Sequence, residues 1–275
     1  MNAYGERLAA VVAQRGRLCV GVDPHLSILQ QWGLPLDASG LERCAMTLVE
    51  AVADQVAVLK PQSAFFEVFG SAGIAVLEKV LGAIREAGAL SLLDVKRGDI
   101  GSTMAAYAQA YLGEGPLAAD AITISPYLGF GSLQPAIDLA VANGRGVYVL
   151  VRTSNPEGHE VQTARHHDLT VAQQVLEAGA AINRDHARIE DGVPGPVGAV
   201  VGLTHQALDI DLSRFAGSLL VPGLGAQGGT PEHVATLFGD QTPLTLPSTS
   251  RDIAEAGPDP AAIRRRTAEV AAALR

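Results

Sequence analysis

Short apolar runs alternate with segments of helical periodicity along almost the whole chain. The runs are four to seven residues long and most are rich in Val, Ile or Leu, which is typical of strands buried on both faces of a parallel sheet. Eight such runs occur, over 18–22, 56–59, 89–95, 121–125, 146–151, 197–201, 218–221 and 244–247. Helical patterns separate them, over 41–54, 73–87, 102–111, 132–143, 169–188 and 260–274, and Thr230 before Pro231 indicates one more helix start.

Eight strands in strict β-α order predict an α/β fold, a (β/α)8 TIM barrel, with a doubly wound open sheet as the alternative. The length of 275 residues suits one barrel, which typically takes about 250. Two segments, 155–168 and 190–196, are expected to be loops, and no linker divides the chain. We therefore expect a single barrel domain over residues 1–275.

Composition narrows the class of protein. Apolar residues make up 48% of the chain, which excludes a disordered protein, yet no apolar stretch is long enough to cross a membrane. The apolar patch near the N-terminus is too short for a secretion signal. A net charge of −9 without a basic block argues against nucleic acid as a partner. Cys19 and Cys44 have neither metal-ligand nor redox spacing, so we expect no metal and a cytoplasmic location.

The lysines are few, and two of them stand at strand ends. The chain has three lysines against 17 arginines. Arg replaces Lys easily on a solvated surface, but not where a compact amine is needed. Lys60 and Lys96 each follow an apolar run, whereas Lys79 lies in a helical pattern. Strand ends of a barrel usually belong to the active site, so Lys60 and Lys96 are candidate functional residues.

The strongest local signal is the segment from Asp94 to Asp99, which reads Asp-Val-Lys-Arg-Gly-Asp. Residues two apart in a strand point to the same side, so Asp94 and Lys96 should share a face at the end of the third strand. Two carboxylates near one ammonium indicate a fixed cation, and Lys96 could donate a proton as a general acid. A local salt bridge at a strand end is the alternative.

Two further strand ends carry charge. A lysine buried at the position of Lys60 is costly unless it is paired, with extension into solvent as the alternative. Asp23 follows the first run, where it shares a face with Gly21. It is a candidate binding residue, or else a turn-forming Asp before Pro24.

The loops after the fifth, seventh and eighth runs suggest ligand binding. Gly225 and Gly228 lie in a glycine-rich loop that could offer backbone N–H groups to an anion, and Arg251 could bind a phosphate bidentately. Phosphate binds at these two loops in many barrels, although flexible turns are the alternative. Ser154 could hydrogen-bond an amide-like ring, or could form a simple Ser/Thr turn.

Together these motifs resemble those of the orotidine 5′-phosphate decarboxylases. Asp-x-Lys-x-x-Asp-Ile, with Thr103 four residues after Asp99, closely resembles the family hallmark. Val-Gly-Val-Asp-Pro, Leu-Lys-Pro, Pro-Gly-x-Gly-Ala-Gln-Gly-Gly and Ser-Arg-Asp-Ile follow in the family's order, from about residue 18 to 253. The length and Thr-Ser-Asn-Pro resemble the longer bacterial subfamily, although many family members have Gly where this chain has Ser250.

The resemblance implies decarboxylation of orotidine 5′-monophosphate to uridine 5′-monophosphate in pyrimidine biosynthesis, without a cofactor. Lys96 would protonate the product carbon within an alternating array of Lys60, Asp94, Lys96 and Asp99. The remaining assignments that the resemblance implies are ribose binding by Asp23, pyrimidine binding by Ser154 and phosphate binding by Gln227 and Arg251.

The resemblance also implies a homodimer, because the second Asp of the hallmark reaches into the partner's site. Asp99 and Thr103 would then act across the subunit interface. The alternative for Asp99 is an N-cap of the following helix within its own subunit.

Two other functions compete with this interpretation. One is a metal-dependent aldol enzyme resembling hexulose-phosphate synthases, which would use the acidic residues to hold Mg²⁺. Lys60 argues against it, because a second ammonium repels a metal ion. The other is a noncatalytic nucleotide-binding barrel, which would gain little from a packed set of lysines and aspartates.

Overall fold

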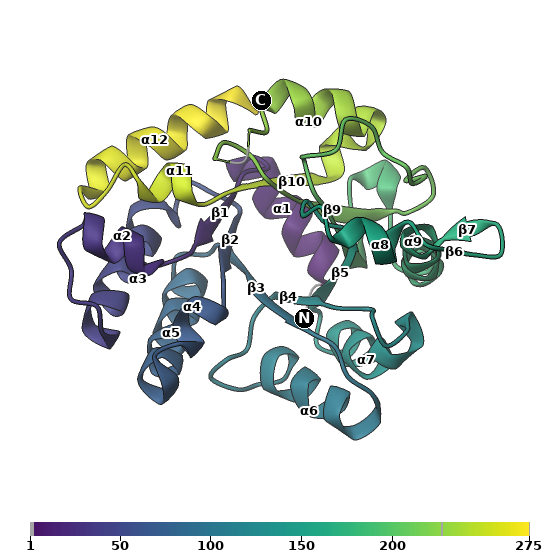
Figure 1. Ribbon diagram of the computed structural model, residues 1–275, viewed down its shortest axis with the longest axis horizontal. Coiled ribbons are helices and arrows are strands. Elements are labelled where there is room, and N and C mark those ends of the chain that lie inside the picture. The colour runs from purple at the N-terminus through teal and green to yellow at the C-terminus, as the bar shows by residue number, and fades with distance from the viewer. Residues whose placement is uncertain (1–2, 227, 275) are drawn as a thin grey trace.

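Eight parallel strands form a closed barrel, and each coincides with one of the predicted apolar runs. The computed structural model describes residues 3–226 and 228–274. The strands follow one another around the barrel in chain order, and the last pairs with the first (Figure 1). They are β1 (Cys19–Val22), β2 (Val58–Pro61), β3 (Leu90–Arg97), β4 (Ala121–Ile124), β5 (Gly146–Arg152), β8 (Gly195–Val201), β9 (Gly217–Pro222) and β10 (Thr245–Thr249). The open-sheet alternative is therefore wrong.

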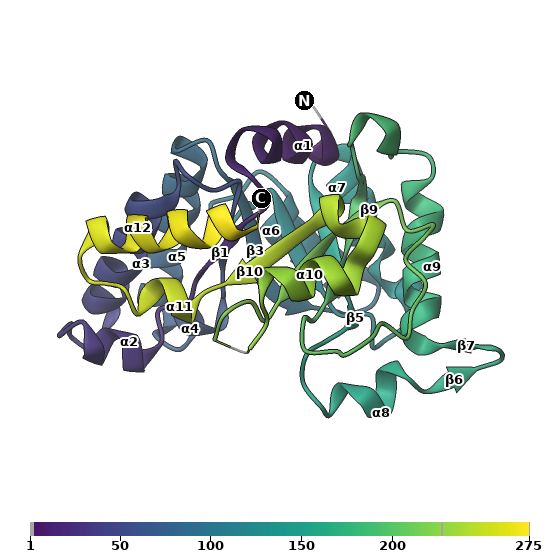
Figure 2. The same cartoon turned by 90° about the horizontal axis from the view of Figure 1, so that it is seen from above.

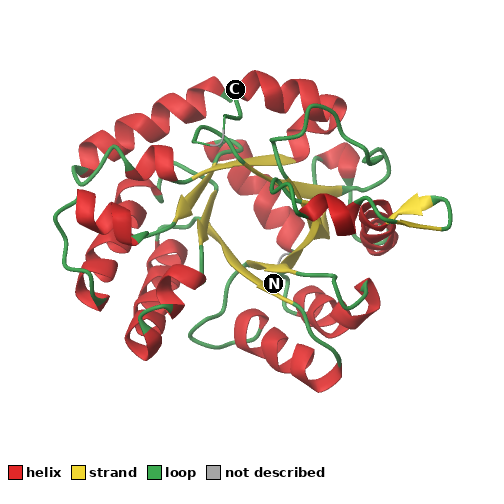
Figure 3. Cartoon of the chain, viewed as in Figure 1, coloured by secondary structure: helices red, strands yellow, loops and turns green. Residues whose placement is uncertain are grey.

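Helices enclose the barrel on its outside (Figure 3). The longer ones are α1 (Tyr4–Arg15), α2 (Leu26–Gln31), α3 (Ala38–Val52), α5 (Gly70–Glu86), α6 (Gly101–Leu112), α7 (Gln134–Ala142), α9 (Val171–Asn183), α10 (Pro231–Phe238) and α12 (Pro260–Ala273). Shorter helical segments are α4 (Ala64–Glu67), α8 (Gly158–Gln162), α11 (Arg251–Ala254), η1 (Phe130–Leu133), η2 (Ile189–Asp191) and η3 (Gly239–Leu244). No helix of the described residues is long and apolar enough to span a membrane.

Alternation along the strands creates two cores. In β3, Leu90 and Leu92 pack inside the barrel, whereas Leu93 packs outward against the helices. The same alternation continues toward the end of the strand, where Asp94 takes the inward position. An inward polar residue beyond two inward leucines places charge at the mouth of the barrel.

Helix α1 covers the N-terminal end of the barrel, a feature that the sequence did not predict. The Tyr4 and Tyr148 hydroxyls are 2.9 Å apart, which joins α1 to the barrel interior. A Cβ at Gly146 would lie 2.5 Å from the Tyr4 ring, so a side chain there would displace the helix. Figure 2 shows α1 at one end of the barrel and α8 at the other. The opposite, C-terminal end is therefore the end left for a ligand.

The segment predicted as a loop over 155–168 contains regular structure. It holds α8 and then the strand β6 (Arg165–His166), which pairs with β7 (Leu169–Thr170) in a hairpin that projects from the body (Figure 1). The helix predicted over 169–188 is shorter, because Thr170 caps it at Gln173 N and it ends at Asn183. No residue of α8 is buried, so no apolar periodicity marked that helix.

Candidate active site

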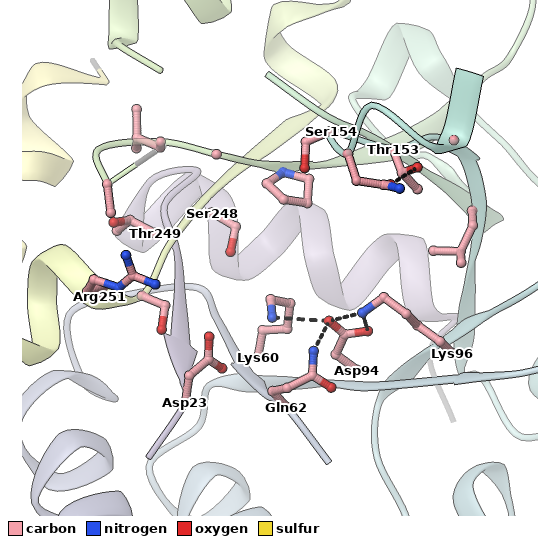
Figure 4. A pocket seen from close by; sticks show the side chains of 18 of the residues that line it. Asp23, Lys60, Gln62, Asp94, Lys96, Thr153, Ser154, Ser248, Thr249 and Arg251 are labelled. Carbon is pink, nitrogen blue, oxygen red and sulfur yellow. Dashed lines mark hydrogen bonds and ion pairs between the residues drawn. The ribbon is translucent and has the colours of Figure 1, made fainter. Parts of the chain in front are cut away.

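A pocket of about 500 Å³ opens at the C-terminal end of the barrel. Residues from the ends of β1, β2, β3, β5 and β10 meet there (Figure 4). The lining includes Asp23, His25, Lys60, Gln62, Asp94, Lys96, Thr153, Ser154, Ser248, Thr249, Ser250 and Arg251. Most of the charged residues that the sequence singled out are thus brought together.

The Asp94 carboxylate is the centre of this pocket. Lys96 Nζ donates to both carboxylate oxygens, at 2.7 and 2.8 Å, and Lys60 Nζ lies 3.3 Å from Oδ2. The Gln62 amide donates to Oδ2 at 2.9 Å, and the Thr123 hydroxyl donates to Oδ1 at 2.7 Å. Figure 4 shows Asp94 between the two lysines. Two ammonium groups therefore share one carboxylate.

Electrostatics keep Asp94 and Lys60 ionised. Burial alone would raise the pKa of Asp94, but the charges of Lys60 and Lys96 outweigh it and lower the pKa to about 2. Burial alone would lower the pKa of Lys60, but the nearby Asp23 and Asp94 carboxylates outweigh it and raise the pKa. Lys60 does not extend into solvent, since only 8% of its side chain is exposed. The solvent-exposed alternative for Lys60 is therefore wrong.

A bulge in β3 brings Lys96 onto Asp94. Pairing with β4 shifts register between Leu93 and Arg97, and Lys96 has a φ of 45°, in the left-handed region that few non-glycine residues occupy. The sequence predicted that regular alternation alone would place Asp94 and Lys96 on one face. Their contact is confirmed, but it depends on this irregular backbone as well.

Asp23 lies in the pocket at the end of β1, and one of its oxygens has no donor in the described part of the chain. Its Oδ1 is buried and has no hydrogen-bond partner among the described residues. A Cβ at Gly21 would lie 2.6 Å from the Ser250 Cβ, so the glycine makes room for that side chain. Gly21 and Ser250 thus fit one another where β1 meets the end of β10.

Of the residues predicted to bind phosphate, some line the pocket and others do not. Arg251 lines the pocket. Gly225 and Gly228 lie in the loop after β9, but Gly225 N–H donates to the Gly229 carbonyl and Gly228 N–H donates to the Gly225 carbonyl. The expectation that these two N–H groups are exposed to an anion is thus wrong for this conformation. Gln227 lies outside the described residues.

The carboxylate that follows Arg251 in the chain is already paired with another arginine. Asp252, the next residue, accepts bidentate hydrogen bonds from Arg266 of α12, at 2.9 and 3.1 Å. Within the described chain, Arg251 itself forms no ion pair. The guanidinium of Arg251 is therefore available for an anion in the pocket.

Ser154 lines the pocket beside a small hydrogen-bonded clamp. Gln162 of α8 accepts from the Thr153 N–H at 3.0 Å and donates to the Thr153 hydroxyl at 2.7 Å. The Ser154 carbonyl accepts from Thr204. Helix α8 therefore holds the segment that carries Ser154 at the pocket mouth.

Comparison with known proteins identifies the family. The sequence profile of the orotidine 5′-phosphate decarboxylase / HUMPS family matches residues 16–266. The chain belongs to this family. An orotidine 5′-phosphate decarboxylase from Salinispora tropica is 53% identical over 96% of this chain and 94% of its own length. A homologue of the same name from Streptomyces coelicolor is 50% identical over 100% of this chain and 98% of its own length.

Solved structures agree with this assignment. A Streptomyces avermitilis crystal structure, assigned provisionally as an orotidine 5′-phosphate decarboxylase, has a TM-score of 0.94 and 49% identity, covering 100% of this chain and 95% of its own. The Leishmania donovani OMP decarboxylase has a TM-score of 0.76 and 31% identity, covering 99% of this chain and 98% of its own. The decarboxylase family and the TIM barrel predicted from the sequence are thus confirmed.

Two residues of the family hallmark lie outside the pocket of their own chain. Asp99 Oδ1 accepts from the Ile100 N–H at 2.8 Å, and Thr103 is exposed on α6. Ile100 is the N-cap position of α6 and receives no side-chain cap. The alternative in which Asp99 caps this helix is therefore wrong.

Sequence reasoning missed two polar residues that donate hydrogen bonds to the Asp94 carboxylate. Gln62 lies two residues after Lys60, on the same side of the chain, and Thr123 is the one polar residue inside the apolar run of β4. Both signals were present in the sequence. Neither signal is enough to identify a site residue from the sequence. Each residue contacts Asp94, which is 32 positions from Gln62 and 29 from Thr123 in the chain.

Proposed function

We propose that this chain decarboxylates orotidine 5′-monophosphate to uridine 5′-monophosphate, a step of pyrimidine biosynthesis, in the cytoplasm. The observation that carries the proposal is the buried Asp94 carboxylate shared by two ammonium groups, at the mouth of a barrel of this family. Both described cysteines are free and buried, which suits a reducing compartment.

Lys96 is the proposed catalytic acid. When the bond between C6 and the carboxylate breaks, the electron pair stays on C6 and CO2 leaves. A fixed ammonium stabilises that negative charge as it develops, and then transfers one proton to C6. The Lys96 side chain is 47% exposed, so solvent can return the proton to the neutral amine.

Asp94 and Lys60 hold that ammonium in place. Asp94 binds Lys96 through both carboxylate oxygens, which restricts where the cation can move. Lys60 keeps Asp94 ionised, and with Gln62 and Thr123 it completes a set of donors to both carboxylate oxygens. A magnesium ion would have to displace these donors, which favours the decarboxylase over the aldol enzyme.

The remaining polar groups are proposed to bind the nucleotide. Arg251 lies across the pocket from Lys96 in Figure 4, so phosphate binding at Arg251 would leave the base near the lysine. Asp23, between them, would accept from a ribose hydroxyl with its carboxylate. Ser154 would contact the pyrimidine, and Gln227 would add a second phosphate contact. Binding energy at the phosphate can then align the charges at C6.

The decisive assay follows the loss of orotidine 5′-monophosphate in the presence of excess EDTA. We expect turnover that EDTA does not change. Turnover that EDTA abolishes would mean that the decarboxylation needs a metal ion. Absence of turnover with and without EDTA would refute the decarboxylase, and tight nucleotide binding in that case would favour the noncatalytic barrel.

We further propose that the active unit is a homodimer with shared sites. Asp99 and Thr103 lie outside the pocket of their own chain, where they are free to reach a partner. The adjoining loops after β3 and β4, joined by a hydrogen bond from Ser125 N–H to the Arg97 carbonyl, also expose the apolar side chains Ile100, Tyr127 and Leu128. Exposed apolar groups of this size favour a protein interface.

Subunit mixing tests the shared site. Lys96→Ala and Asp99→Ala subunits should each be nearly inactive alone. In a mixed dimer, one site collects both defects and the other has neither. Random exchange makes half of the dimers mixed, so activity should recover to about one quarter of wild type. No recovery, with exchange confirmed by an independent label, would mean that Asp99 serves its own subunit.

A further inference from the structure

Thr123 of β4 lies directly beneath the Asp94–Lys96 pair. Ala121, two residues earlier, packs inside the barrel, whereas Ile122 and Ile124 pack outward, so Thr123 takes the next inward position. Only 1% of the residue is exposed. A buried hydroxyl must find its partners inside the protein, and both partners of this one belong to the active site.

The first partner is the backbone of Lys96. Leu93 pairs with Ile122 and Arg97 pairs with Ile124, so three residues of β3 lie opposite Thr123 alone. Such a bulge interrupts the ladder and leaves amides without a carbonyl on the neighbouring strand. The Lys96 N–H donates instead to Thr123 Oγ1 at 2.9 Å. The hydroxyl thus replaces a ladder partner at the residue whose φ is 45°.

The second partner is the carboxylate that Lys96 binds. A threonine hydroxyl has one proton to donate. Because Oγ1 already accepts from the Lys96 N–H, that proton is directed to Asp94 Oδ1, at 2.7 Å. One hydroxyl therefore connects the backbone of Lys96 to the side chain of Asp94. It fixes both ends of the ion pair in one arrangement.

We propose that Thr123 is a positioning residue for decarboxylation, which holds the left-handed backbone of Lys96 and the orientation of Asp94 so that the ammonium stays aimed at the reacting carbon. The proposal rests on the proposed function. Thr123 acts through its two neighbours and need not touch the substrate. A displacement of about 1 Å at a reacting group can cost about 100-fold in rate, so loss of this connection should affect turnover more than binding.

The test replaces Thr123 by valine, which keeps the branched shape and removes the hydroxyl. We expect kcat for orotidine 5′-monophosphate to fall about 10- to 100-fold, while the Kd for uridine 5′-monophosphate stays within about twofold of wild type. Thr123→Ser restores a hydroxyl and should recover most of the lost kcat. This separation of kcat from product affinity, with rescue by serine, is not expected of a residue that only stabilises the fold.

Thr267→Val is the matched control. Thr267 is also fully buried, but its hydroxyl donates to the Ile263 carbonyl within α12, so kcat should not change. If Thr123→Val does not fold, Thr123→Ala takes its place, and failure of both to fold would assign the hydroxyl to stability and overturn the proposal. So would a kcat within twofold of wild type, or a parallel loss of kcat and product affinity without rescue. A wild type without decarboxylase activity would refute the proposed function itself.

Discussion

The two ends of the barrel both contain buried polar groups, but they use charge differently. At the N-terminal end, Arg7 pairs with Asp120, whose other oxygen accepts from the Ser91 N–H and hydroxyl at 2.9 and 3.0 Å. At the C-terminal end, Lys60 and Lys96 share Asp94. Asp120 forms an ion pair with one cation at the first end, and Asp94 forms ion pairs with two at the second.

This difference separates stability from chemistry. At the N-terminal end both oxygens of Asp120 have donors, and α1 covers the barrel (Figure 2). The C-terminal cluster has an excess of donors, and the buried Asp23 Oδ1 beside it lacks a partner in the described chain. We therefore expect the covered N-terminal end to serve stability, and the C-terminal end, where the pocket opens, to serve the chemistry. The predictions below test this contrast, from the largest expected effect to the smallest.

Loss of the Lys96 amine should have the largest effect. We expect Lys96→Ala to lower kcat for orotidine 5′-monophosphate by at least about 1,000-fold, because it removes both the proton donor and the cation at the reacting carbon. The thermal unfolding temperature should change little, since the side chain is half-exposed. Steady-state kinetics and circular dichroism measure the two effects.

Lys79→Ala is the matched lysine control. Lys79 forms an ion pair with Glu42 on the helical surface, away from the pocket, so its loss should leave kcat at the wild-type value. Near-normal activity in a folded Lys96→Ala variant would refute the catalytic role of Lys96.

Much of the fold and of the C-terminal site could be predicted from the sequence, but not all of it. The apolar runs located all eight barrel strands, and alternation placed Asp94 and Lys96 together, because a strand buried on both faces leaves a strong local signal. Helix α1 was missed, because few of its side chains are buried and its partner, Tyr148, is 144 positions away. The Lys96 bulge and the hydrogen bonds of Thr123 were also missed, since both depend on pairing between β3 and β4.

At the C-terminal end, loss of the Arg251 guanidinium should have an intermediate effect, on ligand binding. We expect Arg251→Ala to weaken uridine 5′-monophosphate binding about 10- to 100-fold and to leave uridine binding nearly unchanged. A hydrogen bond to a charged group contributes about 1.5–3 kcal/mol, and only the nucleotide carries the phosphate. Isothermal titration calorimetry with both ligands measures the difference.

Arg265→Ala is the control for total charge, because Arg265 is exposed on α12 and away from the pocket lining. It should change neither affinity. Equal losses for nucleotide and nucleoside in Arg251→Ala would place that guanidinium outside the phosphate site.

The smallest effect is expected at the N-terminal end, where Arg7→Met keeps most of the aliphatic chain and removes the charge. We expect the free energy of unfolding in urea to fall by about 1 kcal/mol, because Asp120 loses a partly buried partner and the Gly144 carbonyl loses a donor. The value of kcat should stay the same. Arg188→Met is the control, since its ion pair with Glu6 is half-exposed and contributes less. A clear loss of kcat in Arg7→Met, at wild-type stability, would mean that charge at this end affects the reaction at the other. The separation of stability from chemistry along the barrel axis would then be wrong.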